Sequence, residues 1–225
     1  MIRQSVFDLS LQQSYRAEDY FSCGSNARAQ AQLMARDWPG GRMLLIGPGG
    51  AGKTHLAHIW AASAGAQMVA AADLGNADLG RLSGALVIED AEGLAGDPSA
   101  EAALFHLWNR AETLLITAAA PPRDWGLALP DLVSRVQSMV IAQLDAPDDA
   151  LLSAVLVKLF ADRQIQVQPN LIAFLLPRME RSVAAARQIV ADLDARSLAL
   201  GKPITRTFVA EFLRDDGTLD RIGPG

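Results

Sequence analysis

The sequence predicts an α/β protein, with a five-stranded parallel sheet flanked by helices and a small all-α unit after it. Two observations predict this class. Through the first two thirds of the chain, short unbroken apolar runs alternate with stretches of helical periodicity, and glycine and proline mark the joints. Beyond residue 146 the apolar runs stop and only helical periodicity continues, which indicates a separate helical part.

Four apolar runs have the length and continuity of strands that are buried on both faces of a sheet. Helical segments separate them, and alternation of strand and crossover helix requires the strands to run parallel. A weaker run supplies a fifth strand. The four clear runs are residues 43–46, 85–88, 114–117 and 139–142, and the weaker one is residues 67–70.

Helical periodicity accounts for the segments between and after these strands. Leu104, Leu107 and Trp108 share one face by their spacing, and Asp97 before Pro98 is typical of an N-cap followed by a first-turn proline. The remaining helices are expected at about residues 26–36, 56–63, 148–163, 169–178, 182–200 and 206–213.

The composition of the 225-residue chain excludes several protein classes. Half of the residues are apolar and a fifth are charged, which excludes a disordered chain. Twenty basic and 25 acidic residues give a net charge of −5, the wrong sign for a broad basic face that binds nucleic acid. The single cysteine, Cys23, allows no internal disulfide, and no apolar run reaches the roughly 20 residues that span a bilayer. We therefore expect a cytoplasmic protein that does not bind membranes.

Residues 47–54 match the phosphate-loop pattern G-x-x-x-x-G-K-S/T in full, between a predicted buried strand and an amphipathic helix. In such a loop the backbone N–H groups converge on an anion, the lysine reaches the outer phosphates and the hydroxyl binds Mg²⁺. The sequence therefore predicts a nucleotide-binding site that holds Mg²⁺. The loop and the residue after it are Gly47, Pro48, Gly49, Gly50, Ala51, Gly52, Lys53, Thr54 and His55.

Two acids, Glu89 and Asp90, follow the apolar run of residues 85–88. In a pair of this kind the first carboxylate holds the metal, together with Thr54, and the second orients water for hydrolysis. The shorter carboxylate usually comes first, whereas here the longer glutamate does. Since an alignment error of about 1 Å can lower a rate about 100-fold, we expect nucleotide binding to tolerate this order better than hydrolysis does.

With these motifs the chain resembles the AAA+ ATPases, and within them the DnaA-related regulators of replication initiation, the Hda-like family. The resemblance covers about residues 4–213. Residues 21–28 are similar to that group's Phe-x-x-Gly-x-Asn stretch, which implies that Phe21 belongs to the adenine pocket. Residues 127–135 resemble the family's Pro-Asp-Leu-x-Ser-Arg segment. This implies that Arg135 is an arginine finger, which acts on the γ-phosphate held by a neighbouring protomer.

The start of the chain resembles the peptide by which this family docks on the DNA polymerase III β sliding clamp. Gln4, Phe7 and Leu9 take the positions of its glutamine and apolar anchors. A terminus that packs its apolar residues on its own domain is the alternative interpretation. The resemblance divides the chain into an N-terminal tail (1–15), a nucleotide-binding base (16–146), a helical lid (147–214) and a flexible C-terminal tail (215–225).

The sequence departs from the family's pattern at two sensor positions. Ala119 stands where an acidic sensor is common, and Ala184 stands where the lid usually has an arginine. Arg187, about one helical turn away, or Arg181 could replace the missing lid arginine. Together with the order of the two acids, these differences imply that the chain is a weak ATPase by itself.

The resemblance implies a negative regulator of replication initiation. ADP or ATP would occupy the loop, the N-terminal peptide would bind the DNA-loaded clamp, and Arg135 would promote hydrolysis of the ATP of a DnaA-type initiator. Since no helix-turn-helix domain follows the lid, we expect no direct sequence-specific DNA binding. Two alternatives stay open: an autonomous ATPase that acts as a replication accessory or loader, and a binding module that uses ADP as a structural ligand. Self-association through Arg135 and the choice between ADP and ATP are also open.

Overall fold

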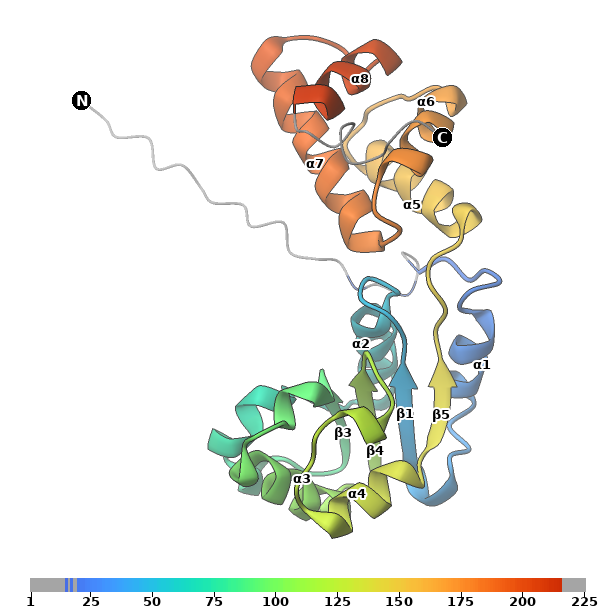
Figure 1. The fold of residues 1–225 in the computed structure, drawn as a ribbon. Coiled ribbons are helices and arrows are strands. Elements are labelled where there is room, and N and C mark those ends of the chain that lie inside the picture. The colour runs from blue at the N-terminus through green and yellow to red at the C-terminus, as the bar shows by residue number, and fades with distance from the viewer. Residues whose placement is uncertain (1–14, 16, 18–19, 216–225) are drawn as a thin grey trace, which may run out of the picture.

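The protein is described by a computed structural model, which covers residues 15, 17 and 20–215. It confirms the predicted fold class: five parallel strands form one sheet in the order β2-β3-β4-β1-β5, with helices on both faces (Figure 1). All five predicted strands are present within two residues of their expected bounds. They are β1 (Arg42–Ile46), β2 (Gln67–Ala70), β3 (Ala85–Glu89), β4 (Thr113–Ala118) and β5 (Val140–Gln143).

Alternate residues of the strands belong to two separate apolar clusters, one on each face of the sheet. Met43 and Leu45 of β1 belong to one cluster and Leu44 to the other. The first face is covered by α1 (Ala27–Ala35) and α2 (Lys53–Ala64), and the second by α3 (Pro98–Arg110), α4 (Pro130–Gln137) and several 3-10 turns. The period of two along each strand therefore places one helical layer on each side.

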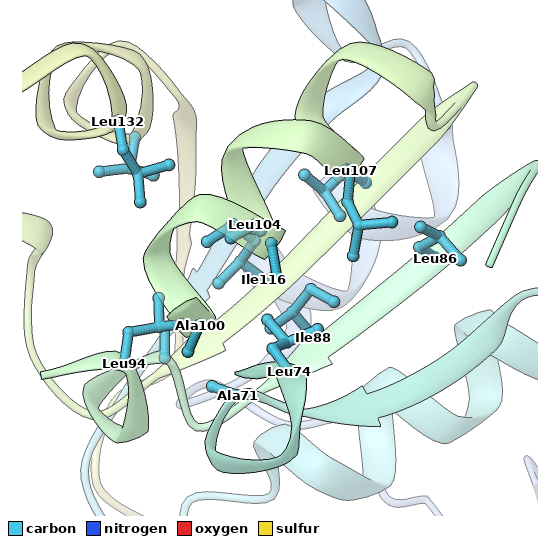
Figure 2. Packing of buried hydrophobic residues seen from close by; sticks show 14 of the residues in the cluster. Ala71, Leu74, Leu86, Ile88, Leu94, Ala100, Leu104, Leu107, Ile116 and Leu132 are labelled. Atoms are coloured by element: carbon cyan, nitrogen blue, oxygen red, sulfur yellow. The ribbon is translucent and has the colours of Figure 1, made fainter. Parts of the chain in front are cut away.

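The layer between α3 and the sheet consists largely of leucine and isoleucine side chains (Figure 2). Leu104 and Leu107 of α3 lie beside Ile88 of β3 and Ile116 of β4, and solvent reaches none of these four side chains. Burying one side chain of this size stabilises a fold by about 1.5–3 kcal/mol. The position of α3 on the sheet is therefore well determined.

The two edges of the sheet differ from the predicted interior strands. The prediction that the run 139–142 is buried on both faces is wrong, because β5 lies at the edge of the sheet and Ile141 is 42% exposed. The strand also begins at Val140 rather than at Met139. The weaker run at residues 67–70 forms the opposite edge, β2. An edge strand has one neighbour fewer, and its apolar side chains are less completely covered.

The helical part has an apolar cluster of its own, which includes Phe160, Leu175, Val190 and Phe208. Figure 1 shows this part beyond the carboxyl ends of the strands. The predicted helix 169–178 ends earlier than expected and continues as a 3-10 turn, because Pro177 has no N–H to donate. Within the described ranges, no helix is both long and apolar enough to cross a bilayer. The helices are α5 (Asp149–Asp162), α6 (Pro169–Leu175), α7 (Val183–Leu200) and α8 (Arg206–Asp215).

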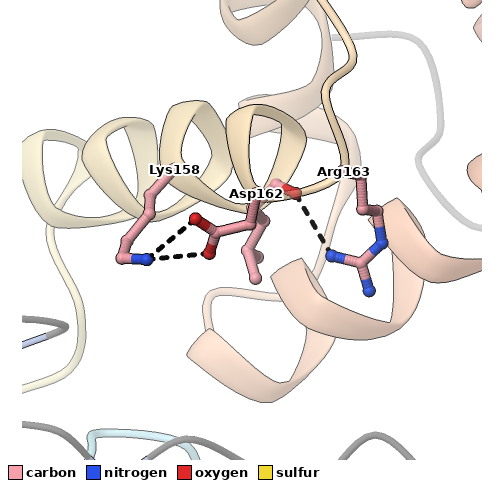
Figure 3. Close-up of polar contacts among 4 residues, drawn as sticks. Lys158, Asp162 and Arg163 are labelled. Carbon is pink, nitrogen blue, oxygen red and sulfur yellow. Dashed lines mark hydrogen bonds and ion pairs between the residues drawn. The ribbon is translucent and has the colours of Figure 1, made fainter. Parts of the chain in front are cut away.

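Charged side chains cluster at the end of α5 (Figure 3). The Lys158 ammonium lies 2.8 Å from the carboxylate of Asp162, one turn further along the helix. The Arg163 guanidinium donates to the carbonyl of Leu159 at 3.2 Å and lies 3.6 Å from Asp194 of α7. A cation at a helix C-terminus satisfies a free carbonyl and suits the helix dipole. Because ion pairs that solvent still reaches, such as Lys158–Asp162, contribute only about 0.2–1 kcal/mol, apolar packing dominates here.

Asp97 caps α3 as the sequence predicts. Its carboxylate accepts the N–H of Ser99 at 2.9 Å and that of Ala100 at 3.1 Å. The hydroxyl of Ser99 and the N–H of Ala100, which donate to this carboxylate, hold the pKa of Asp97 below its usual value. The start of α3 is therefore stabilised by an ionised cap.

Leu104→Ala is expected to lower the free energy of unfolding by about 2–5 kcal/mol, because it leaves a cavity between α3 and the sheet. Leu198→Ala is the matched control, since Leu198 is 77% exposed and its truncation leaves no cavity. Urea unfolding followed by circular dichroism measures both. Equal losses in the two variants would contradict the packing of α3.

Asp97→Ala is expected to destabilise the fold at neutral pH, and the deficit is expected to shrink in acid. The pKa of Asp97 is lower in the folded chain than in the unfolded chain. The stabilisation is therefore complete above the unfolded pKa, near 3.9, and is lost as the pH falls through the folded value. Urea midpoints of both proteins between pH 7 and pH 3 measure this, and a deficit that stayed constant with pH would exclude an ionised cap.

Candidate nucleotide site

The predicted phosphate loop connects the carboxyl end of β1 to α2 (Figure 1). Gly47 begins the loop, and its N–H donates to the carbonyl of Ala118 at the end of β4, at 3.2 Å. A Cβ on Gly47 would stand 2.8 Å from the carbonyl oxygen of Leu144, just after β5. Only glycine fits between these two strand ends, so the loop is held where the three neighbouring strands finish.

Lys53, the first residue of α2, folds back over the loop. Its Nζ donates to the carbonyls of Gly47 at 2.8 Å and Pro48 at 3.2 Å, and the residue is only 8% exposed. Among the described residues, no carboxylate forms an ion pair with it. Because a buried cation needs an anionic partner, this ammonium fits the phosphate oxygens of a nucleotide.

Glu89 ends β3 on the neighbouring side of the site. Its Oε1 is buried and has no hydrogen-bond partner among the described residues. Burial raises the pKa of Glu89, whereas the hydroxyl of Thr54 and the nearby His58 act in the opposite direction. A free carboxylate oxygen beside a hydroxyl is a donor set that suits Mg²⁺. The residues present therefore fit the metal that the sequence predicts.

Asp90 marks the point where the chain leaves β3. Its backbone is left-handed, with φ of 53°, and its N–H donates to the hydroxyl of Thr117 at 3.1 Å. This conformation is uncommon for residues other than glycine, and aspartate is one of the few that tolerate it. Thr117, which is fully buried in β4, thus fixes the backbone beside the two acids.

Glu92 was not found by sequence analysis. Its Oε1 accepts the N–H of Ala119 and, at 2.9 Å, that of Ala120. Ala119, where the sequence predicts a sensor position, therefore receives a carboxylate at its backbone from the 3-10 turn after β3. No local pattern signals this contact, because it joins residues 27 and 28 positions apart.

The segment before α1 lies along α2, next to the loop. The ring of Tyr20 meets His55 edge-on with centroids 5.3 Å apart, and the ring of Tyr15 stacks on His58 at 4.1 Å. Burial raises the pKa of the Tyr20 phenol. Phe21, the predicted adenine-pocket residue, follows directly and is half-buried, and His55, predicted with the phosphate loop, belongs to the same region. The predicted clamp-binding residues Gln4, Phe7 and Leu9 lie outside the described residues.

The first turn of α7 touches the loop. The N–H of Val183 donates to the carbonyl of Gly50 at 3.2 Å, and Ser182 caps α7 by accepting the N–H of Ala185 at 3.0 Å. A Cβ on Gly50, whose φ is +72°, would stand 2.3 Å from the Cβ of Ser182. A change in the conformation of the loop would therefore act directly on the start of α7. Serine before a helix is a capping signal that could have identified Ser182.

The arginines near the lid sensor position have different surroundings. Ala184 is exposed in the first turn of α7, and Arg187 follows one turn later, with no hydrogen bond or ion pair to another described residue. Arg181 instead contacts Asp149 at 2.7 Å and the carbonyl of Pro147 at 3.1 Å. The suggestion that Arg181 reaches the phosphates is therefore not supported, because its guanidinium is bound at the start of α5.

Arg135 lies in the last turn of α4, which leads into β5. Its guanidinium donates to Asn109 Oδ1 at 2.7 Å and stands over the ring of Phe105, 4.4 Å from the centroid. The carboxyl end of β5 adjoins the loop. The helix α4, which precedes β5, therefore ends at the amino ends of the strands (Figure 1). Arg135 is therefore not part of the phosphate site of its own chain.

Solved structures of the replication initiator DnaA and of RuvB share this architecture. Domain III of the Thermotoga maritima initiator DnaA matches with a TM-score of 0.77 and 18% identity, over 89% of this chain and 96% of that one. The fold is that of a AAA+ P-loop domain. AMPPCP-bound DnaA from Aquifex aeolicus matches at 0.68 and 16% identity, over 82% of this chain and 66% of that one. A RuvB variant from Thermotoga maritima matches at 0.65 and 19% identity, over 84% and 65%.

The likeness has a defined extent. The chain spans about two thirds of these longer DnaA and RuvB chains. No family model matches the sequence. At identities below 20%, these neighbours show that the fold is shared. The roles of individual residues must instead be inferred from the geometry of this chain.

Gly50→Ala is expected to lower the free energy of unfolding by about 1–3 kcal/mol, because a side chain is strained at positive φ and collides with Ser182. Gly49→Ala is the control, since a Cβ at Gly49 meets nothing within 4 Å. Urea unfolding without nucleotide measures both variants. Equal stability of the two would contradict the contact between the loop and α7.

Proposed function

We propose that the chain is a negative regulator of chromosomal replication initiation, which binds adenine nucleotide and promotes hydrolysis of the ATP held by a DnaA-type initiator. The observation that carries this proposal is the position of Arg135. Asn109 and Phe105 fix its guanidinium near the amino ends of the strands, whereas the phosphate loop of the same chain lies at the carboxyl ends. No described carboxylate pairs with it. Such an arginine is suited to a nucleotide on another protein.

The nucleotide would occupy the loop between β1 and α2. Lys53 and the loop N–H groups would bind the phosphates, and Thr54 and Glu89 would hold Mg²⁺, which neutralises phosphate charge when it is bound. Phe21 and His55 would lie on the adenine side, and Arg187, one turn into α7, would be the cation for the outer phosphates. ADP or ATP fits this arrangement, and the contact of Gly50 with α7 would couple occupancy to the lid.

The distance across the sheet supports action on a second protein. The four residues of β5 separate α4 from the carboxyl ends of the strands, where the loop lies. At about 3.3 Å per residue, this separation is roughly 13 Å. A single arginine side chain does not bridge this length. An arginine that acts on a neighbour's γ-phosphate can be worth 10³–10⁵ in rate. Arg135 would therefore supply the catalytic group, while the initiator supplies the ATP.

The N-terminal peptide would bring the two proteins together. Its proposed anchors, Gln4, Phe7 and Leu9, would bind the sliding clamp of DNA polymerase III on DNA. A tether of this kind raises the local concentration of the finger near its target without adding contacts to the initiator. The stimulation should therefore depend on the clamp.

An autonomous ATPase is the second candidate. It is favoured by Glu89, which stands beside Thr54 with a free oxygen and could support hydrolysis of the chain's own nucleotide. A competent enzyme of this kind should turn over at about 1 s⁻¹ or faster without a partner. Steady-state ATP hydrolysis by the chain alone separates this candidate from the regulator.

The decisive experiment measures hydrolysis of ATP prebound to the initiator, with this protein, ADP and clamp loaded on DNA. We expect clamp-dependent acceleration, and we expect Arg135→Ala to reduce it by about 10³-fold or more while clamp binding persists. Arg123→Ala is the control, because the Arg123 side chain is 77% exposed and its ion-pair partner among the described residues is the adjacent Asp124.

Lys53→Ala is expected to weaken nucleotide binding, measured with a fluorescent ADP analogue, because it removes the buried ammonium at the loop.

Two outcomes of the hydrolysis experiment would contradict the proposal. Full acceleration by Arg135→Ala would exclude the finger and favour regulation by occupancy. No acceleration by the wild type, with nucleotide binding intact, would exclude the proposed function itself.

A further inference from the structure

We propose that α3 positions the arginine finger through one face of the helix, which holds Arg135 in place without neutralising its charge. This face consists of Glu101, Phe105 and Asn109, spaced at i, i+4 and i+8, and is called the α3 clamp below. Residues at this spacing lie above one another on a helix. The inference rests on the proposed role of Arg135 and assigns positioning residues to that role.

The first part of the α3 clamp holds the backbone at the start of α4. Glu101 is 3% exposed, and its carboxylate accepts the N–H of Ala128 at 2.9 Å and that of Leu129 at 2.7 Å. A buried carboxylate is tolerated only when such donors surround it. Leu129 is the residue directly before α4. Glu101 therefore fixes where α4 begins.

The second part holds the side chain of Arg135 itself. The face of an aromatic ring attracts a cation, and the Phe105 ring lies 4.4 Å beneath the guanidinium carbon. Asn109 accepts one N–H, at 2.7 Å. A guanidinium has five N–H donors, so most of them are left for a phosphate. Both partners are neutral, and the full positive charge of Arg135 is retained.

A carboxylate in place of Asn109 would have the opposite effect. Arginine and carboxylate form a charge-assisted, often bidentate ion pair, which uses two donors and neutralises the charge. Phe105 and Asn109, the two neutral residues of the α3 clamp that contact Arg135, thus order the guanidinium before the partner arrives, whereas a carboxylate at position 109 would compete with the partner's phosphate. The α3 core beneath it, built on Leu104 and Leu107, keeps this face fixed relative to the sheet. Ordering a catalytic group in advance raises the rate by lowering the entropy lost in the reaction.

The test uses Asn109→Asp in the full-length protein, in the assay of initiator-bound ATP. The substitution keeps the size of the side chain, and we expect the saturating stimulated rate to fall by about 10-fold, part of the 10³–10⁵ that a finger supplies. The concentration for half-maximal stimulation should not change, because docking does not involve Asn109. Gln137→Glu is the matched control: it makes the same amide-to-carboxylate change two residues after Arg135, where side chains do not face each other.

A second measurement tests the contact without any assay of hydrolysis. Asn109→Asp gains an ion pair with Arg135 but loses the hydrogen bond from Asn109 Nδ2 to the carbonyl of Phe105, at 3.1 Å. Its effect on the thermal midpoint should therefore be more favourable by about 1–2 °C when Arg135 is present than when Arg135→Ala is also made. Gln137→Glu should show no such dependence on Arg135.

The outcomes separate the two proposals. Absence of acceleration by the wild-type protein overturns the proposed function and, with it, the positioning role. Acceleration by the wild type that Asn109→Asp leaves at the level of Gln137→Glu overturns the positioning role alone. A selective fall in the saturating rate, together with coupling between positions 109 and 135 in unfolding, supports the α3 clamp.

Discussion

The candidate site depends on the order of three parallel strands, in which β4 lies between β1 and β3. Because the carboxyl ends of parallel strands share one edge, the loop after β1 meets the residues that follow β4 and β3. Hydrogen bonds join them in a row: the N–H of Gly47 donates to the carbonyl of Ala118, the N–H of Asp90 to the hydroxyl of Thr117, and the N–H of the residue after Ala118 to the carboxylate of Glu92. None of these contacts would form in a different strand order. The lysine, the hydroxyl and the two acids come together for this reason.

The fold separates two candidate sites, one at the carboxyl ends of the strands and one at their amino ends. At the carboxyl ends the phosphate loop contacts the start of α7. At the amino ends, α4 carries Arg135, whose guanidinium contacts Asn109 and Phe105 of α3. A protein that binds a nucleotide at one edge and offers an arginine at the other is suited to act between neighbours. The length of β5 between the two sites keeps Arg135 away from the phosphate loop of its own chain.

Much of the fold could be predicted because its signals are local. The phosphate loop lies within eight consecutive residues, the interior strands are unbroken apolar runs, and the Asp97 cap is visible in two residues. One error arose where the environment of a segment decides its structure: the run at 139–142 looks like an interior strand, but its edge position exposes Ile141. The surroundings of the two arginines considered for the lid could not be predicted either, since the contacts of Arg181 with Asp149 and Pro147 depend on how α5 packs.

The sequence by itself determined the fold class, the phosphate loop and the acids that follow β3, because each follows from residue type and short spacing. Only the tertiary structure decided what surrounds them. It placed the carboxylate of Glu92 at the backbone of the sensor position, and the ring of Phe105 and the amide of Asn109 at Arg135. The physical reason is that these contacts join residues more than 25 positions apart. Their formation depends on how two elements pack, and no pattern within either element records it.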